Sequence, residues 1–193
     1  KRIVNMVQSA NFQTIMTSKD ALTGTDRLAE ASQHIEADIY INVQGDEPLV
    51  KPSDILKIRD AKIDQINKVI NGFNWINNNE DPNNVNIPKV VTNENNDLVY
   101  MSRKAIPGFK NLKYSSLRYK KQVCIYAFTK EELLSYKNYD RKSKLEQYED
   151  IEILRFLELG KVIKMIETEA GSLAIDVPED VPKVEDVLKK KFT

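Results

Sequence analysis

The sequence has a single cysteine, a single histidine and no excess charge of either sign. Cys124 has no partner for an internal disulfide, which excludes a small disulfide-stabilised scaffold. Lysine plus arginine and aspartate plus glutamate each number 29, so there is no positive field of the kind that attracts nucleic acid phosphates. No apolar run is long enough to span a bilayer, and no apolar signal segment opens the chain. We therefore expect a cytoplasmic protein that binds neither nucleic acid nor membrane.

At 193 residues the chain can form one domain with a real core, with or without a small appended lobe. It begins without an initiator methionine, and residues 1–7 already have the pattern of an amphipathic helix. This start is typical of a fragment, although natural processing and a chosen chain boundary give the same sequence.

Short β-branched runs alternate with helical patterns along the chain. A buried strand is predicted at residues 39–43, between helices predicted at 26–35 and 52–66, which is the order of a βαβ unit. Further strands are predicted at 69–74, 88–92, 98–103, 122–128 and 162–166, and further helices at 130–136, 145–160 and 179–191. The strongest helical pattern is 145–160, with Gly160 as its C-cap. The alternation predicts an α/β fold.

Three polar segments are candidates for chemistry. Asp46 lies in a Gln-Gly-Asp-Glu-Pro turn directly after the predicted strand, where an aspartate can hold Mg²⁺ against phosphates, although a solvated turn has the same pattern. Asp176 follows an apolar pair and precedes a Pro-Glu-Asp triplet, and it is also a suitable helix cap. Residues 23–25 form a glycine-centred turn into a helix, which suits backbone contacts to a nucleotide or a plain capped helix start.

The order and separation of the motifs are more specific than any one of them. The motifs are Thr-Gly-Thr-Asp-Arg-Leu-Ala-Glu (23–30), Val-Gln-Gly-Asp-Glu-Pro (43–48), Pro-Lys-Val-Val (88–91), Met-Ser-Arg-Lys-Ala-Ile-Pro (101–107), Ile-Tyr-Ala-Phe (125–128), Leu-Glu-x-x-Glu-x-x-Glu-Ile-Leu-Arg (145–155) and Ile-Asp-Val-Pro-Glu-Asp (175–180). Together they resemble the CMP-Kdo synthetase family, the cytidylyltransferases of 3-deoxy-manno-octulosonate (Kdo). The resemblance covers nearly the whole chain from about Val4 onward.

The resemblance implies an open, mostly parallel Rossmann-like three-layer sandwich of the nucleotide-diphospho-sugar transferase type. Residues 1–193 would form a single cytidylyltransferase domain that lacks its N-terminal nucleotide-binding strand and loop, with a small lobe at about 98–125 that helps to form a homodimer. In the implied reaction, the anomeric hydroxyl of a sugar acid attacks the α-phosphate of CTP and pyrophosphate leaves.

The resemblance also implies roles for particular residues. Asp46 and Asp176 would share Mg²⁺ as catalytic and metal-binding residues, and Arg103 would offer its guanidinium to a carboxylate or phosphate. Thr23, Gly24 and Thr25 would lie on the nucleotide side. The predicted substrate-binding residues are Gln44, Arg27, Gln122, Glu146, Glu149 and Glu152. The three glutamates are spaced to fall along one helix face, although each also suits a solvent-facing position. Arg103 also suits a surface ion pair, and Arg27 a solvated position in the first turn of a helix.

The sequence departs from the family pattern in two places. An Arg-x-x-Ser-x-Arg-x-Pro-Gly-Lys loop that cradles the triphosphate does not occur, so we expect the natural protein to carry an N-terminal extension of some tens of residues. Gln122 and Gln147 stand where the family has histidines in segments near the sugar. Glutamine forms hydrogen bonds but carries no charge, so a related or amino-modified acidic sugar fits as well as Kdo.

Two other functions are compatible with the sequence. One is a nucleotidyltransferase for another acidic sugar, such as a nonulosonate, or for another nucleotide. The other is a non-catalytic binding protein that kept the fold, which the missing phosphate loop favours and the retention of Asp46 and Asp176 opposes. An α/β hydrolase and a dinucleotide-binding dehydrogenase are weaker interpretations, because the chain has neither Gly-x-Ser-x-Gly nor Gly-x-Gly-x-x-Gly.

Overall fold

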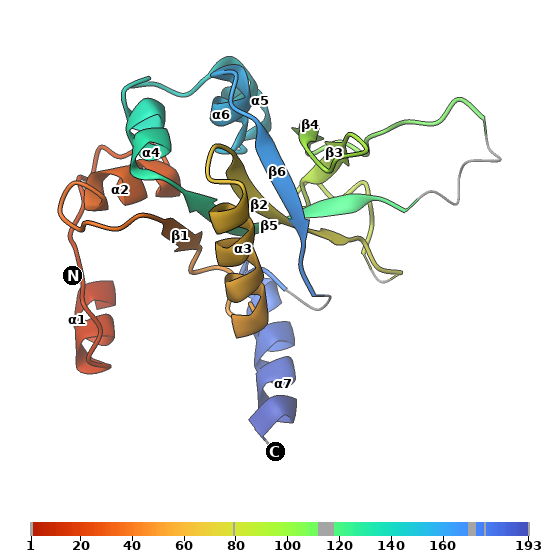
Figure 1. The fold of residues 1–193 in the computed structure, drawn as a ribbon. Helices are drawn as coiled ribbons and strands as arrows, with labels where there is room; N and C mark the ends of the chain where they lie inside the picture. Colours follow the sequence, from red (N-terminus) through yellow and green to blue (C-terminus); the bar gives the residue numbers. More distant parts are fainter. Residues whose placement is uncertain (1, 79, 112–117, 170–172, 176, 193) are drawn as a thin grey trace.

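A mixed β-sheet lies at the centre of the computed structural model, which describes residues 2–78, 80–111, 118–169, 173–175 and 177–192 (Figure 1). Its six strands are β1 (Tyr40–Val43), β2 (Val69–Trp75), β3 (Lys89–Thr92), β4 (Leu98–Ser102), β5 (Lys120–Phe128) and β6 (Ile163–Glu167). They follow the order β4-β3-β5-β2-β6, and β1 pairs with one end of β5. The expected open α/β sheet is therefore confirmed.

The strand directions differ from the expected, mostly parallel sheet. Only β2 and β6 pair in parallel among the described strands. β5 runs antiparallel to β1, β2 and β3, and β3 runs antiparallel to β4 because the two are joined by a tight turn at residues 93–97. A tight hairpin can join only antiparallel strands, whereas parallel neighbours need a longer crossover.

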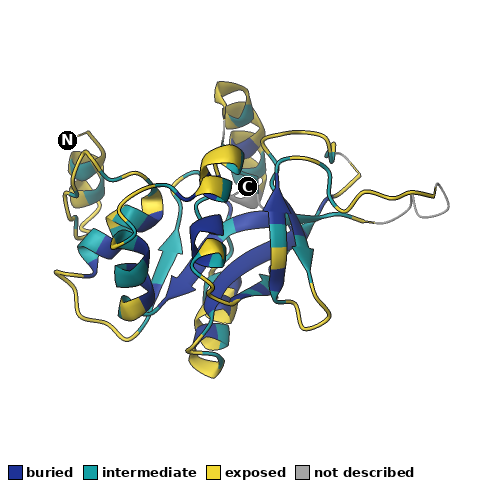
Figure 2. Cartoon of the chain, turned by 90° about the horizontal axis from the view of Figure 1, so that it is seen from above, coloured by how far each residue is buried: buried dark blue, intermediate teal, exposed yellow. Residues whose placement is uncertain are grey.

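Helices cover both faces of the sheet, as Figure 2 shows by the buried strands between helices with exposed outer surfaces. Side chains alternate along β5, so that Val123, Ile125 and Ala127 pack with α3 (Pro52–Asp64) on one face. Tyr126 and Phe128 face the other side and pack with α2 (Gly24–Ala31), α4 (Lys130–Lys137) and α6 (Leu154–Glu158). The expected three-layer sandwich is confirmed.

The prediction of one continuous helix at 145–160 is wrong. The structure has two short helices there, α5 (Lys144–Glu149) and α6, separated by residues 150–153, and the first of these, Asp150, has a left-handed φ of 50°. Arg103 provides the reason, because its guanidinium donates to the carbonyl oxygens of Glu149 and Asp150 at 2.5 and 2.9 Å. These carbonyls therefore need no partner in a continuing helix.

The remaining elements agree in type with the sequence prediction and differ at their ends. The N-terminal helix α1 (Arg2–Ser9) has no buried residue, and the C-terminal helix α7 (Val181–Phe192) follows a 3₁₀ turn at Pro178–Asp180. The lobe predicted at about 98–125 stays a prediction. Its described ends, β4 and the start of β5, belong to the central sheet, and residues 112–117 lie outside the described part of the chain. No helix formed by the described residues is long and apolar enough to cross a membrane.

Gly72 of β2 is a position where any side chain would clash. A Cβ there would lie 2.6 Å from Cγ2 of Ile125 and 3.1 Å from Cγ2 of Thr168. We expect Gly72→Ala to lower the free energy of unfolding by about 1–3 kcal/mol, because β5 and β2 must separate to admit the methyl group. Urea denaturation followed by circular dichroism checks this, with Gly45→Ala as the control because a Cβ at Gly45 meets no atom within 4 Å. Equal stability of the two variants would contradict the prediction.

Candidate active site

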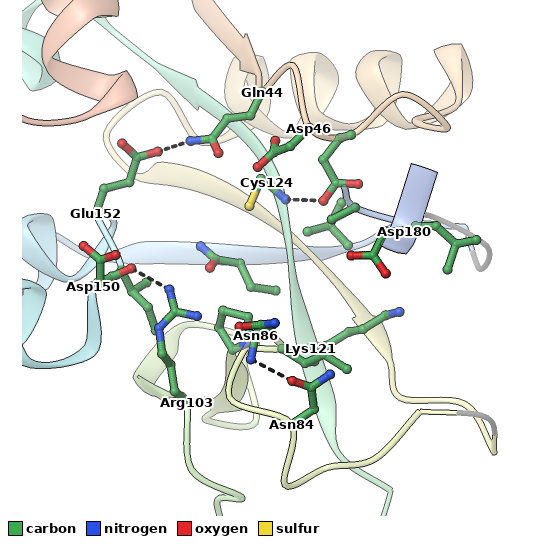
Figure 3. Close-up of a pocket in the computed structure, with 18 of the residues that line it drawn as sticks. Gln44, Asp46, Asn84, Asn86, Arg103, Lys121, Cys124, Asp150, Glu152 and Asp180 are labelled. Carbon is green, nitrogen blue, oxygen red and sulfur yellow. Dashed lines mark hydrogen bonds between the residues drawn. The ribbon is translucent and has the colours of Figure 1, made fainter. Parts of the chain in front are cut away.

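A pocket of about 990 Å³ opens beside the carboxyl end of β1 (Figure 3). The turn after β1, the start of α2, strand β5, the α5–α6 connection and the polar loop around residues 77–88 all contribute to its walls. Gln44, Asp46, Gln122, Cys124 and Glu152 line it together although they are far apart in sequence. Ligand sites of open α/β proteins lie at this edge of the sheet, beyond the carboxyl ends of strands.

Asp46 lines this pocket, and one of its carboxylate oxygens has no hydrogen-bond partner among the described residues. Its Oδ1 atom is buried and accepts no hydrogen bond from the described residues. Buried carboxylate oxygens rarely stay unpaired, so this atom suits a cation that arrives with the substrate. No cluster of three or more His, Cys, Asp or Glu side chains suited to a metal occurs in the described part of the chain. Mg²⁺ needs no such cluster, since one or two carboxylates with waters and substrate phosphates commonly hold it.

The C-terminal segment meets Asp46 through the backbone. The N–H of Ile175 donates to the carbonyl oxygen of Asp46 at 2.9 Å. Asp176, the second predicted metal ligand, is the next residue and lies outside the described residues. The pairing of the two aspartates therefore stays a prediction, although the described neighbour of Asp176 contacts Asp46 directly.

Glu152 connects two of the predicted motifs inside the pocket. Its carboxylate accepts from the backbone N–H of Thr25 at 2.9 Å and from the side-chain amide of Gln44, a contact drawn in Figure 3. Burial raises the pKa of Glu152 above the ordinary glutamate value, while the hydrogen bond from the Thr25 backbone N–H opposes the rise. The carboxylate thus fixes the Gln44 amide relative to the start of α2.

The turn at residues 23–25 is the capped start of α2. Thr23 Oγ1 accepts from the N–H of Asp26 at 3.2 Å and lies 3.1 Å from the Tyr136 hydroxyl. Thr23 and Gly24 line the pocket, whereas Thr25 is buried behind it. Arg27 is not among the pocket residues, because its guanidinium donates to Thr17 Oγ1 and the Ser18 carbonyl at 2.9 and 2.8 Å.

The three predicted glutamates do not share one helix face, because the chain turns at Asp150. Glu146 is buried and accepts from Arg155 Nε and Nη2, each at 2.7 Å. Burial would raise the pKa of Glu149, but hydrogen bonds from the Arg103 N–H and the Ser102 hydroxyl hold it below its usual value. Glu146 and Glu152 line the pocket, whereas Glu149 is not among the pocket residues, and only the Glu152 carboxylate accepts from both Thr25 and Gln44. The shared face predicted from the spacing is therefore wrong.

Arg103 lies at the pocket wall, where three of its guanidinium N–H groups are already used. They donate to the backbone carbonyls of Glu149, Asp150 and Val85. The contact with Asp150 is visible in Figure 3. The guanidinium thus joins the α5–α6 turn to the polar loop, and its remaining N–H groups are those available to an anionic ligand.

Sequence reasoning missed three residues near the pocket. Lys121 precedes Gln122 on β5 and forms an ion pair with Glu80 of the polar loop. Arg155 is the last residue of the 145–155 motif, in which roles were assigned only to the glutamates, although it pairs with Glu146. Asn71 lies on β2 and contacts Gln122. Lys121 could have been found from its position next to Gln122 in a strand that lines a pocket. Local patterns could not have found the other two, because Asp26, which pairs with Arg155, and Gln122, which contacts Asn71, lie 129 and 51 residues away in sequence.

Comparison with known proteins gives a consistent result. Residues 1–164 match a family model described as cytidylyltransferase. A 3-deoxy-manno-octulosonate cytidylyltransferase of Flavobacterium johnsoniae is 36% identical over 97% of this chain and 77% of its own length. One of Parabacteroides distasonis is 38% identical over 94% of this chain and 76% of its own length.

Solved structures agree with these relatives. The structure of CMP:2-keto-3-deoxy-manno-octonic acid synthetase complexed with CTP superimposes with a TM-score of 0.88 at 34% identity, and the match covers 98% of this chain and 78% of that one. The inositol-1-phosphate CTP transferase from T. maritima has a TM-score of 0.66 at 17% identity over 96% of this chain and 70% of that one, which shows a shared fold.

Proposed function

Because this chain belongs to the cytidylyltransferase family, we propose that it transfers CMP from CTP to the anomeric hydroxyl of 3-deoxy-manno-octulosonate or a closely related sugar acid. The anomeric oxygen forms a bond to the α-phosphorus, the bond from that phosphorus to pyrophosphate breaks, and the hydroxyl proton is released. The observation that carries the proposal is the pocket at the carboxyl end of β1, which is lined by the Gln44–Glu152 pair and by Asp46, whose Oδ1 accepts no hydrogen bond from the described residues.

We propose that the reaction uses Mg²⁺ held by Asp46, with Asp176 as its expected partner. When bound, the ion neutralises charge that develops on the phosphates. The fit rests on the buried Oδ1 of Asp46, which accepts no hydrogen bond from any residue that the structure describes.

The other pocket residues bind and orient the two substrates. Gln44 is held by Glu152, so its amide keeps one position beside the start of α2. Its side chain therefore loses little conformational entropy when it binds a sugar hydroxyl. The remaining N–H groups of Arg103 can bind a carboxylate. Thr23 and Gly24 border the same space on the side that we assign to the nucleotide.

Pyrophosphate release by the natural protein tests this function. The assay contains Mg²⁺, one of the four nucleoside triphosphates and one of a panel of acidic sugars that includes Kdo and a nonulosonate. We expect release only with CTP and a Kdo-like sugar. Release with another sugar acid would correct the substrate, and no release with any pair by a folded protein would favour the non-catalytic alternative.

The homodimer, expected from the resemblance, and the cytoplasmic location, expected from the composition, remain predictions. Analytical ultracentrifugation of the natural protein distinguishes a monomer from a dimer directly.

A further inference from the structure

Asn71 is a fully buried polar residue at an irregular place in the sheet. The pairing of β2 with β5 shifts between Asn71 and Gly72, so that Asn71 faces Tyr126 while Gly72 faces Val123. The Asn71 Nδ2 atom donates to the carbonyl oxygens of Val123 and Ile125 at 2.9 and 3.0 Å. The side chain thus satisfies backbone carbonyls at the bulge.

These two bonds fix which way the Asn71 amide points. Backbone carbonyls only accept hydrogen bonds, so the atom that faces them must be the NH₂ group. The Oδ1 atom is then on the opposite side and can only accept. It lies 3.1 Å from the side-chain amide of Gln122, which must therefore present its own NH₂ group to Asn71.

The same argument determines what Gln122 presents to the pocket. Its Nε2 atom donates to Asn71 Oδ1 and to the Tyr126 hydroxyl oxygen at 3.1 and 3.3 Å, which uses both N–H bonds of the amide. Burial raises the pKa of Tyr126, so the phenol stays neutral. No described residue donates to Oε1 of Gln122, a residue that lines the pocket.

We propose that Asn71 is a positioning residue that locks the Gln122 amide with its oxygen toward the substrate, so that this subsite accepts only a hydrogen-bond donor. The inference rests on the proposed function. The matching group on the sugar acid is a hydroxyl or a protonated amine. A carboxylate, an ether oxygen or fluorine at the same place would face the amide oxygen without a proton between them, and the unpaired groups weaken binding.

Substrate analogues test the polarity of this subsite without any mutation. For each hydroxyl of the accepted sugar acid, kcat/KM is measured for the parent, the deoxy, the deoxyfluoro and the amino compound. We expect one position at which the deoxy and deoxyfluoro compounds lose about tenfold or more in kcat/KM, while the amino compound keeps the kcat/KM of the parent sugar. Fluorine is a weak hydrogen-bond acceptor and cannot donate. If the deoxyfluoro compounds keep the parent kcat/KM at every position, Gln122 does not present its oxygen to the substrate.

Variants of Gln122 and Asn71 then test whether these two side chains cause the penalty at that position. In Gln122→Met the penalty for the deoxy compound at this one position should disappear, while penalties at the other hydroxyls remain. In Asn71→Leu the same penalty should fall by about tenfold, because Gln122 can then rotate. The KM for CTP should not change in either variant, which separates loss of positioning from general damage to the fold.

Asn74 supplies the matched control. It is a buried asparagine on the same strand, and its Nδ2 donates to the Thr168 carbonyl at 2.8 Å without contacting Gln122. Asn74→Leu removes a comparable buried amide and should leave the whole analogue profile unchanged. If Gln122→Met still transfers CMP and its analogue profile is the same as that of the unsubstituted protein, this inference is wrong while the proposed function stands. Absence of transfer to every sugar acid would overturn the proposed function and the inference with it.

Discussion

Asp46→Asn is expected to lower the rate of cytidylyl transfer by about a hundred- to a thousandfold while the protein remains folded. The substitution keeps the size of the side chain and removes its negative charge. The Oδ1 atom is buried in the pocket without a hydrogen-bond donor among the described residues, so the charge has no structural partner to stabilise. Its loss should therefore act on the bound cation rather than on the fold.

Steady-state pyrophosphate release at saturating Mg²⁺ measures the effect on turnover. Binding of Mn²⁺ in the presence of CTP, followed by electron paramagnetic resonance, gives a second measurement that does not depend on catalysis. Asp97→Asn is the control, because Asp97 is a half-buried aspartate away from the pocket whose partner is Lys68 at 2.9 Å. If Asp46→Asn keeps turnover near that of the control, Asp46 does not hold the metal.

Arg155→Met should produce the largest loss of stability, about 3–5 kcal/mol in the free energy of unfolding. The Arg155 side chain is fully buried, and its guanidinium pairs with Glu146 at 2.7 Å and with Asp26 at 3.0 Å. It also lies 3.7 Å from the centre of the Tyr136 ring. Methionine fills similar space but leaves two carboxylates in the interior without their cation.

The same substitution should loosen the pocket, because this cluster joins α2, α4, α5 and α6 behind it. Chemical denaturation gives the change in stability, and Arg59→Met is the control. Arg59 pairs with Asp60 at the surface, where both side chains are about half exposed and solvent weakens the interaction to about 1 kcal/mol or less. A loss below 1 kcal/mol in Arg155→Met would show that the buried carboxylates find other partners or protons.

The positions of strands and helices could be predicted because each depends on a local pattern. β-Branched runs marked the strands, apolar spacing marked the helices, and the Gln-Gly-Asp-Glu-Pro turn placed Asp46 at the end of β1. The metal pair stays a prediction, because Asp46 lines the pocket but Asp176 lies outside the described residues. Arg27, chosen by its motif alone, does not line the pocket.

What the sequence determined by itself is thus the alternation of elements, the order of the motifs and the family that they resemble. The tertiary structure alone decided where the 145–160 helix breaks, which of the three glutamates line the pocket and which atom Gln122 presents. Each of these depends on partners distant in sequence: Arg103 bonds to carbonyls some 46 residues away, and Asn71 to a glutamine 51 residues away. Local periodicity specifies which face of a segment is buried, but it carries no information about the donor that meets a particular carbonyl after folding.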